Sequence, residues 1–456
     1  MNQLKAISVV DGRYASKTKL FQNIFSEYGL IKHRVIVEIE WLKFILKELQ
    51  LETITDLEIN KINKIKDDFN LDSAVKVKEI ENITNHDVKA VEYFIKEQLE
   101  NNNLLKFKEW VHFALTSEDI NNTAYALMLK EGSFIIMDLL RNFLNKLEEL
   151  AKKYKKTPMM SKTHGQPASP TTVGKEFINF AWRIKKELTN LSKIDVEAKL
   201  NGATGNYNAH SFVFPHINWI NASQKFISEY LKLKPIFFTT QINPNSYISE
   251  IMHSLIRISA IMIDLDRDMW GYISFGYFKQ KTKKGEVGSS TMPHKVNPID
   301  FENSEGNLGM AISLMEHLSV KLLNSRFQRD LSDSTVLRNL GLVFSYLVIS
   351  INSSLKGLNK LELNEEIINS DLENNYELLA EPFQMIMRVY KEDSPYEKLK
   401  ELTRGKKVSK NDLIKFIDKL ENIPSEVKNK MKALNPKHYI GKASELVDIY
   451  FKFFND

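Results

Sequence analysis

The chain has 456 residues, of which 43% are hydrophobic and 27% are charged, so it is long enough for about three domains and can bury a large core. It contains no cysteine, which excludes disulfides, thiolate zinc sites and cysteine nucleophiles. Its 63 basic and 58 acidic side chains nearly balance at a net charge of +5, which argues against a protein that binds nucleic acid.

The N-terminal segment, residues 1–14, has no basic region followed by an apolar stretch, so we predict no signal peptide. The longest nearly apolar run, residues 342–351, is far shorter than the roughly 20 residues that cross a bilayer. We therefore expect a cytoplasmic protein without a membrane partner. The lysines at 152–156 are expected to end a helix, where cations complement the helix dipole, rather than to bind nucleic acid.

Five long segments repeat apolar residues at helical spacing. In chain order they run from Leu140 to Ala151, Phe177 to Leu191, Ile248 to Met269, Leu308 to Leu322 and Leu340 to Leu358. Only 12 prolines and 17 glycines interrupt the chain, so we expect an all-α fold with a long central helix bundle. We place an N-terminal helical domain at 1–111, the central bundle at 112–364 and a C-terminal helical domain at 365–456.

Two short segments, Thr84-Asn85-His86-Asp87 and Thr116-Ser117-Glu118-Asp119, are dense in small polar side chains. Such residues are typical of helix N-caps, and this is the simplest interpretation of both segments. A cap also leaves backbone N–H groups open to a ligand, so capping and binding are compatible. A structural and a functional role therefore both stay open here.

A histidine stands in the segment Thr163-His164-Gly165-Gln166-Pro167-Ala168, which we expect to be a loop between two long helices. A lone histidine is more often structural than catalytic, but one beside glycine, glutamine and proline in a loop is a candidate general acid or base.

The segment 279–298 lacks helical periodicity and holds two glycines, three consecutive hydroxyl side chains, and then Lys295 and Asn297. Pro298 precedes an expected helix with Asp300 and Glu302 in its first turn. A hydroxyl-rich loop that leads into a helix N-terminus can bind an anion. The alternative interpretation is a plain surface linker.

Residues 326–339, RFQRDLSDSTVLRN, set three arginines among hydroxyls and carboxylates. Arg329 and Arg338 could each bind a phosphate or carboxylate through two hydrogen bonds, although ordinary surface charge on a helix is the alternative. The ten histidines form no HExxH motif, and no phosphate-binding loop or dinucleotide fingerprint is present. We therefore expect no metal and no cofactor.

The run from Gly288 to Pro298, GSSTMPHKVNP, fills every fixed position of GSSxMPxKxNP, so the chain resembles the fumarase/aspartase superfamily. The segment THGQPA at 163–168 is similar to a second region of that superfamily. The resemblance implies a homotetramer in which the long helices form a twenty-helix core, with active sites shared between subunits.

Within the superfamily the chain resembles the bacterial adenylosuccinate lyase family over residues 8–445. The resemblance rests on VDGRY at 10–14, TNHDVKAVEYF at 84–94, HFALTSEDINN at 112–122, RDLSDSTVLRN at 329–339 and YEKLKELTRGK at 396–406. It implies a β-elimination that releases fumarate from adenylosuccinate, giving AMP, and from SAICAR, giving AICAR.

The same resemblance implies roles for individual residues. Ser289 would be the general base and His164 the general acid, while Lys295 and Asn297 would stabilise the dianionic intermediate and Glu302 would orient His164. By pKa alone a histidine would be the more natural base, so the role of Ser289 depends on the family. The implied substrate contacts are Arg13, Tyr14, Asn85, His86, Asp87, Thr116, Ser117, Gln241, Ser290, Asn297, Arg329, Ser334, Thr335, Val336, Leu337 and Arg338.

Two other functions are compatible with the same scaffold. One is another lyase of the superfamily, such as argininosuccinate lyase, which a panel of substrates would identify. The other is a non-catalytic structural protein, which loss of the catalytic residues would mark. Ser289, His164 and Lys295 are all present in this chain.

Overall fold

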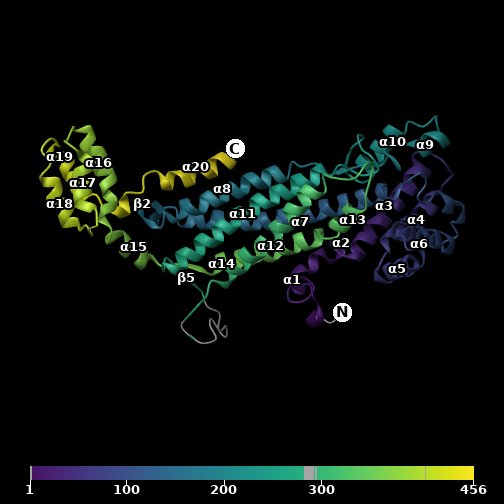
Figure 1. Cartoon of the computed structure of the whole chain (residues 1–456), viewed down its shortest axis with the longest axis horizontal. Helices are drawn as coiled ribbons and strands as arrows, with labels where there is room; N and C mark the ends of the chain where they lie inside the picture. Colours follow the sequence, from purple (N-terminus) through teal and green to yellow (C-terminus); the bar gives the residue numbers. More distant parts are fainter. Residues whose placement is uncertain (1–2, 282–291, 293–294, 406, 456) are drawn as a thin grey trace. The chain divides into compact units, whose positions relative to one another are not determined.

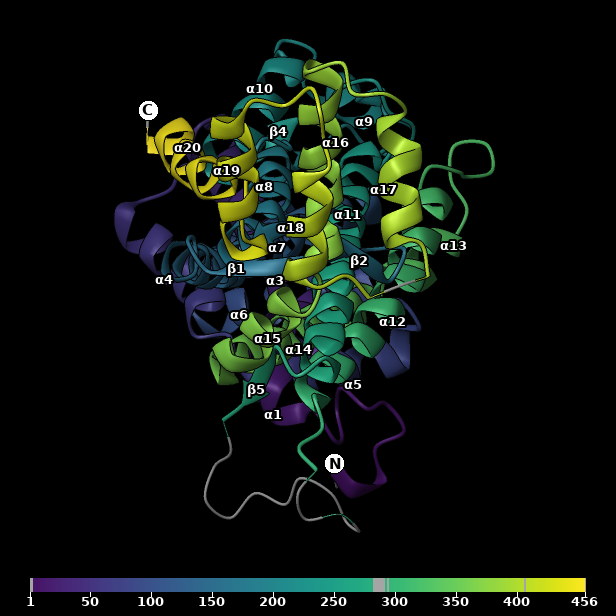
Figure 2. The ribbon, with the colours of Figure 1, turned by 90° about the vertical axis from the view of Figure 1, so that its left-hand side faces the viewer.

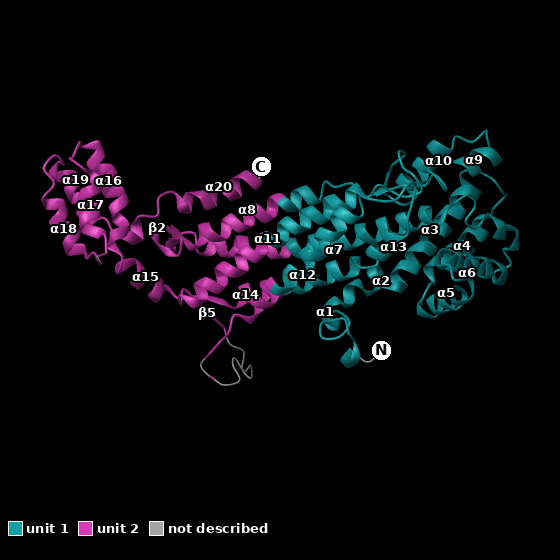
Figure 3. Ribbon diagram, in the orientation of Figure 1, with its two compact units in different colours: residues 1–140, 187–260, 306–352 teal, residues 141–186, 261–305, 353–456 magenta. Residues whose placement is uncertain are grey.

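The computed structural model describes residues 3–281, 292, 295–405 and 407–455, and Figure 1 labels its elements. These residues are mostly helical, which confirms the predicted all-α class. The chain divides into two compact units, shown in Figure 3: residues 1–140, 187–260 and 306–352 form the first, and residues 141–186, 261–305 and 353–456 form the second. The three domains expected at 1–111, 112–364 and 365–456 stay a prediction, because each unit combines segments that are not consecutive.

All five predicted long helices are present. They are α7 (Ser117–Lys153), α8 (Val173–Leu191), α11 (Ser246–Ser274), α12 (Ile299–Lys321) and α14 (Leu340–Lys360). Helix α7 has Glu118 and Asp119 in its first turn and Lys152 and Lys153 in its last, so both ends complement the helix dipole. The expectation that this lysine cluster ends a helix is confirmed.

The first unit contains further helices, most of which are shorter. They are α1 (Ala15–Thr18), α2 (Gln22–Phe25), α3 (Glu27–Lys47), α4 (Asp56–Asp67), α5 (Leu71–Thr84), α6 (Asp87–Asn101), α9 (Asn208–Val213), α10 (Trp219–Lys225) and α13 (Ser332–Leu337). Side chains set where some of them begin. Ser26 accepts a hydrogen bond from the N–H of Gly29 at the start of α3, and Thr55 and Glu58 form a capping box on α4.

An apolar cluster joins α3, α6 and α7 in the first unit. Val37, Val88 and Ile120 are fully or almost fully buried there, and Leu115 and Leu127 pack against them. Burying each such side chain stabilises the fold by about 1.5–3 kcal/mol. The cluster therefore holds the N-terminal ends of α6 and α7 against α3, and the polar residues described below lie at those two ends.

The second unit contains the other shorter helices. They are α15 (Glu365–Glu373), α16 (Ala380–Val389), α17 (Pro395–Thr403), α18 (Lys410–Asp418), α19 (Ser425–Ala433) and α20 (Ala443–Asn455). Helix α16 packs against α17 and α18 against α19 (Figure 2). A cluster that includes Phe383, Met387, Leu413 and Ile417 gives this C-terminal segment a core of its own.

Strands in the described part of the chain are short and pair two by two. They are β1 (Pro158–Thr163) with β2 (Gln166–Thr172), β3 (Glu197–Ala198) with β4 (Lys234–Pro235), and β5 (Phe278–Gln280) with β6 (Leu361–Leu363). The first and third pairs are antiparallel and the second is parallel. The expected loop at 163–168 is therefore wrong in detail, because these residues form the end of a β-hairpin.

Among the described residues, one helical stretch, Ser332–Lys360, is long and apolar enough to cross a membrane by length and composition alone. Of its most apolar window, 56% is buried inside the fold. A core helix of a soluble protein meets the same criteria, so this stretch is weak support for a membrane span.

Candidate functional site

The break between α5 and α6 is built from three predicted site residues. Asn85 ends α5 in the left-handed conformation, with φ of 50°, and its N–H donates to the carbonyl of Glu81 at 2.7 Å. His86 is the N-cap of α6, and its Nδ1 accepts a hydrogen bond from the N–H of Lys89 at 3.1 Å. Asp87 begins α6, and its Oδ1 accepts from the N–H of Val88 at 2.9 Å. The capping interpretation of this segment is confirmed.

The second polar segment forms the N-terminal end of α7. Ser117 is the first residue of the helix, and the N–H of Thr116 donates to Oδ2 of Asp119 at 2.9 Å. The other carboxylate oxygen of Asp119 lies 2.9 Å from Nζ of Lys199 and 3.0 Å from the N–H of Asn201. Asp119 thus ties the helix end to the segment that follows residue 198.

These two helix ends line one cavity of about 510 Å³ in the first unit. Its lining residues are Glu81, Asn85, His86, Asp87, Ser117, Asn121, Arg329, Leu331, Ser334, Thr335 and Arg338. Eight of the predicted substrate contacts are among them, although they come from three separate stretches of sequence. Two helix N-termini and two arginines at one cavity create a site suited to an anionic ligand.

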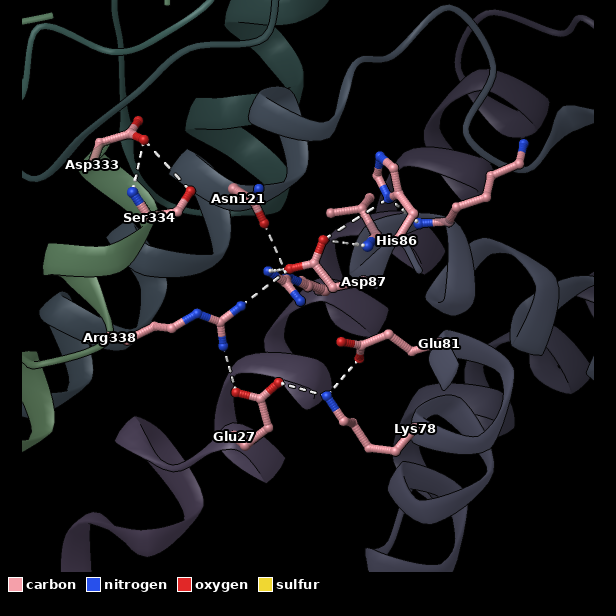
Figure 4. Close-up of polar contacts among 12 residues, drawn as sticks. Glu27, Lys78, Glu81, His86, Asp87, Asn121, Asp333, Ser334 and Arg338 are labelled. Atoms are coloured by element: carbon pink, nitrogen blue, oxygen red, sulfur yellow. Dashed lines mark hydrogen bonds and ion pairs between the residues drawn. The ribbon is translucent and has the colours of Figure 1, made fainter. Parts of the chain in front are cut away.

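Both arginines of the cavity are held by carboxylates of the chain. Arg338 donates through Nη1 to Glu27 at 2.6 Å and through Nη2 to Asp87 at 3.3 Å, as Figure 4 shows. Arg329 lies 2.9 Å from Oε1 of Glu118, and its Nη1 donates to Oε1 of Gln241 at 3.2 Å. Gln241 therefore lies beside Arg329.

The carboxylates behind these arginines differ in their electrostatics. Burial raises the pKa of Asp87, but Arg34, the Val88 amide and Arg338 act against it and the pKa lies below its ordinary value. Burial is the largest effect on Glu118 and raises its pKa, because Arg329 offsets only part of it. Asp87 is therefore the more firmly ionised of the two carboxylates.

Other predicted contacts of the first unit are not among the residues that line this cavity. Arg13 is exposed in a turn before α1, and Tyr14 donates its backbone N–H to the carbonyl of Val9 at 2.9 Å. Thr116 lies one residue before α7, and Val336 and Leu337 end the short helix α13, where Leu337 is buried.

Three polar residues at the cavity were missed by the sequence analysis as site residues. Asn121 lines the cavity, Glu118 pairs with Arg329, and Arg34 in α3 contacts both Asp87 and Asn121. Glu118 and Asn121 belong to the segment HFALTSEDINN, so the resemblance could have pointed to them. Nothing in the sequence around Arg34 distinguishes it from an ordinary helical arginine.

The remaining predicted residues belong to the second unit. His164 and Gly165, with φ of 54° and 72°, form the two-residue turn between β1 and β2, and His164 is exposed. Lys295 is exposed and Asn297 is partly buried. Oε1 of Glu302, in the first turn of α12, accepts a hydrogen bond from Nε1 of Trp270 at 3.1 Å.

Ser289 and Ser290 lie outside the described residues, so their predicted roles rest on the sequence. Among the described residues, no group of three histidine, aspartate or glutamate side chains is arranged to hold a metal ion.

Comparison with known proteins finds relatives along nearly the whole chain. Residues 12–312 match a family described as lyase, and residues 325–440 match one described as adenylosuccinate lyase C-terminal. The chain is 50% identical to the adenylosuccinate lyase of Vibrio cholerae serotype O1, over 98% of this chain and 99% of that protein. It is 48% identical to the adenylosuccinate lyase of Escherichia coli strain K12 with the same coverage.

Solved structures with the same fold include a fumarate lyase from Mesorhizobium sp. BNC1, with a TM-score of 0.79 over 95% of this chain and 97% of that chain. A 3-carboxy-cis,cis-muconate lactonizing enzyme from Pseudomonas putida has a TM-score of 0.77 over 95% of this chain and 96% of that chain. Each is 16% identical to this chain, so the likeness concerns the fold alone.

Proposed function

The chain belongs to the adenylosuccinate lyase family, and on that basis we propose that it splits adenylosuccinate into fumarate and AMP, and SAICAR into fumarate and AICAR. The reaction is a β-elimination that breaks a carbon–nitrogen bond in purine nucleotide biosynthesis. One observation carries the proposal: Arg329 and Arg338 line the same cavity as the N-terminal ends of α6 and α7. Both substrates carry a phosphate and carboxylates, which are the groups that such a site favours.

The chemistry starts at the succinyl carbon beside a carboxylate. Ser289 removes a proton from that carbon, and the electron pair that remains delocalises into the neighbouring carboxyl group, which then carries two negative charges. Lys295 and Asn297 stabilise this dianion, because preorganised donors are most effective where charge develops. The carbon–nitrogen bond then breaks, its electrons leave with the amine, and His164 protonates that amine as Glu302 holds the imidazole in place.

A serine hydroxyl ionises far above neutral pH, so Ser289 needs help to act as a base. The ammonium group of Lys295 and the N-terminus of the helix that begins at Ile299 follow Ser289 closely in the sequence and would supply positive potential to it. Exclusion of water by the bound substrate strengthens both effects.

We also infer a homotetramer whose active sites combine residues of different subunits. The cavity with its arginines belongs to the first unit of the chain, while His164, Lys295, Asn297 and Glu302 belong to the second. The long helices carry large exposed apolar side chains, including Phe134, Trp182, Trp270 and Met310. Exposed apolar surface of this kind is typical of subunit interfaces.

The activity is tested by release of fumarate from adenylosuccinate and from SAICAR, with argininosuccinate as the control substrate. We expect turnover of the first two in a cytoplasmic enzyme that a chelator does not inhibit. Turnover of argininosuccinate instead would identify a different lyase of the superfamily.

The shared site is tested by subunit complementation. Inactive His164→Ala and Ser289→Ala proteins are mixed under conditions that let subunits exchange, and some hybrid sites should then regain both residues. A mixture that exchanges subunits but recovers no activity would place both residues in one subunit's site.

A further inference from the structure

Arg34 lies behind the wall of the site cavity, in the middle of α3, and its side chain is only 2% exposed. Burying an arginine is costly unless its donors are paired. Its Nη2 donates to Oδ2 of Asp87 at 2.6 Å, and its Nε donates to Oδ1 of Asn121 at 2.9 Å. Its Nη1 is buried without a hydrogen-bond partner among the described residues. Both hydrogen bonds of the guanidinium group are therefore donated to residues of the cavity wall, Asp87 and Asn121.

Each of those two residues leads on to an arginine of the cavity. Asp87 also accepts a hydrogen bond from Arg338 at 3.3 Å. Asn121 donates through Nδ2 to Oε1 of Glu118 at 3.1 Å, and Glu118 lies 2.9 Å from Arg329. A continuous chain of polar contacts therefore connects the two cavity arginines, with the buried guanidinium at its centre.

We propose that Arg34 is a positioning residue for the nucleotide site: it fixes Asp87 and Asn121 while the cavity arginines turn to the substrate. The proposal rests on the proposed function for the identity of the ligand. In the free protein Arg338 and Arg329 are occupied by carboxylates of the chain. When a phosphate or carboxylate of the substrate binds those arginines, Asp87 loses its contact with Arg338. Arg34 then keeps Asp87 ionised and in place.

This role predicts a signature in the pH dependence of the reaction. Arg34 is the strongest of the effects that oppose burial and hold the pKa of Asp87 low. Without it the pKa of Asp87 rises, so a higher pH is needed to keep the carboxylate ionised. The acid limb of kcat/KM should then move toward neutral pH, which general damage to the fold would not produce.

The experiment compares full-length Arg34→Lys and Arg34→Met enzymes with wild type, in fumarate release from adenylosuccinate between about pH 5 and about pH 9. Lysine keeps the charge but cannot donate to Asp87 and Asn121 with the same planar geometry. We expect kcat/KM to fall about tenfold in the lysine variant and about a hundredfold in the methionine variant, which also shifts the acid limb upward.

Arg257 supplies the matched control. It pairs with Glu187 at 2.8 Å in the same unit, and it does not line the cavity. Arg257→Lys should keep kcat/KM within about threefold of wild type, with the same acid limb. If Arg34→Met does not assemble, Asn121→Ser takes its place, because it removes the second hydrogen bond to the guanidinium while the ion pair remains; it should lower kcat/KM about fivefold.

Hydrogen exchange separates this proposal from the proposed function. If the wild-type enzyme does not act on adenylosuccinate, the function fails, and the role of Arg34 is read from the ligand-free protein. The amides of Val88 and Lys89 in the first turn of α6 should exchange faster in Arg34→Lys than in wild type or Arg257→Lys. The proposal is overturned if Arg34→Lys retains kcat/KM within about threefold and unchanged exchange of those amides, and Arg34→Met leaves the acid limb unchanged.

Discussion

Nζ of Lys199 lies 2.9 Å from Oδ1 of Asp119, and neither side chain is exposed to solvent. The ammonium group also donates to the carbonyl of Gly202 at 3.1 Å. This buried ion pair fixes the first turn of α7, where Ser117 meets the cavity. Its loss would leave an uncompensated charge inside the first unit.

Replacing Lys199 with Met should therefore destabilise the protein by about 3–5 kcal/mol, the usual cost of breaking a buried ion pair from one side. The measurement is the denaturant midpoint at a fixed protein concentration. Lys430→Met is the control, because Lys430 and its partner Glu426 are both largely exposed and their pair should contribute less than about 1 kcal/mol. Equal midpoints for the two variants would show that the Lys199 pair does not stabilise the fold.

His210→Phe should make the protein less sensitive to acid. His210 is buried against the rings of Tyr207 and Trp219, and burial lowers its pKa to about 4. Between about pH 6.5 and pH 4 the unfolded chain binds a proton that the folded protein excludes. The free energy of unfolding of the wild type therefore decreases as the pH is lowered through this window. When the pH is lowered from about pH 7 to about pH 5, the free energy of unfolding of the variant should decrease by about 2 kcal/mol less than that of the wild type.

The measured quantity is the change in the free energy of unfolding between the two pH values, because any strain from the larger phenyl ring is the same at both. His438→Gln, at an exposed side chain, serves as the comparison for losing an unburied imidazole. Parallel pH curves for wild type and His210→Phe would show that His210 does not cause the acid sensitivity.

Asp266→Asn should have the opposite dependence. Burial raises the pKa of Asp266 to about 7, and its Oδ1 accepts a hydrogen bond from Ser354 at 2.6 Å. Between about pH 4 and pH 7 the folded protein holds a proton that the unfolded chain releases, so wild-type stability falls as pH rises. The variant should gain a few kcal/mol relative to wild type between about pH 5 and pH 8, measured by denaturant midpoints. If the stability difference between Asp266→Asn and wild type is the same at both pH values, Asp266 stays ionised in the folded protein.

Ser289→Ala and Arg329→Ala should fail in different ways. Ser289→Ala should abolish turnover while adenylosuccinate affinity stays within about tenfold, or about 1.4 kcal/mol, because it removes the base rather than a charged contact. Arg329→Ala should weaken binding about a hundredfold, because it removes a cation from the cavity. Calorimetric binding and fumarate release measure the two effects separately. Near-normal turnover by Ser289→Ala would transfer the role of base to another residue.

The sequence predicts the long helices well because their apolar residues repeat every three or four positions, as from Ile248 to Met269 in α11. It also predicts that helices begin near 84–87 and 116–119, where the side chains of His86 and Asp119 accept hydrogen bonds from backbone groups close to them in sequence. Both features depend on local interactions. The hairpin at 158–172 is less visible, since Pro167 and Pro170 argue against a strand, although the pair His164-Gly165 suits a two-residue turn.

The position of Arg34 could not be predicted, because its contacts depend on how three helices pack. Asp87 and Asn121 lie 53 and 87 residues further along the chain. The segments that line the cavity could be identified from their resemblance to a family. That resemblance does not indicate which buried side chains outside the cavity lining contact them.

The N-cap of α6 fixes the tautomer of one candidate residue. Because Nδ1 of His86 accepts the N–H of Lys89, a neutral imidazole must carry its proton on Nε2. While the cap is intact, His86 can therefore offer a ligand a hydrogen-bond donor and has no free lone pair with which to accept a proton. Such an imidazole can donate a hydrogen bond to an anionic oxygen of a ligand, but it cannot remove a proton from a carbon atom. Nitrogen chemical shifts of the free enzyme would show this directly as a protonated Nε2 and an unprotonated Nδ1.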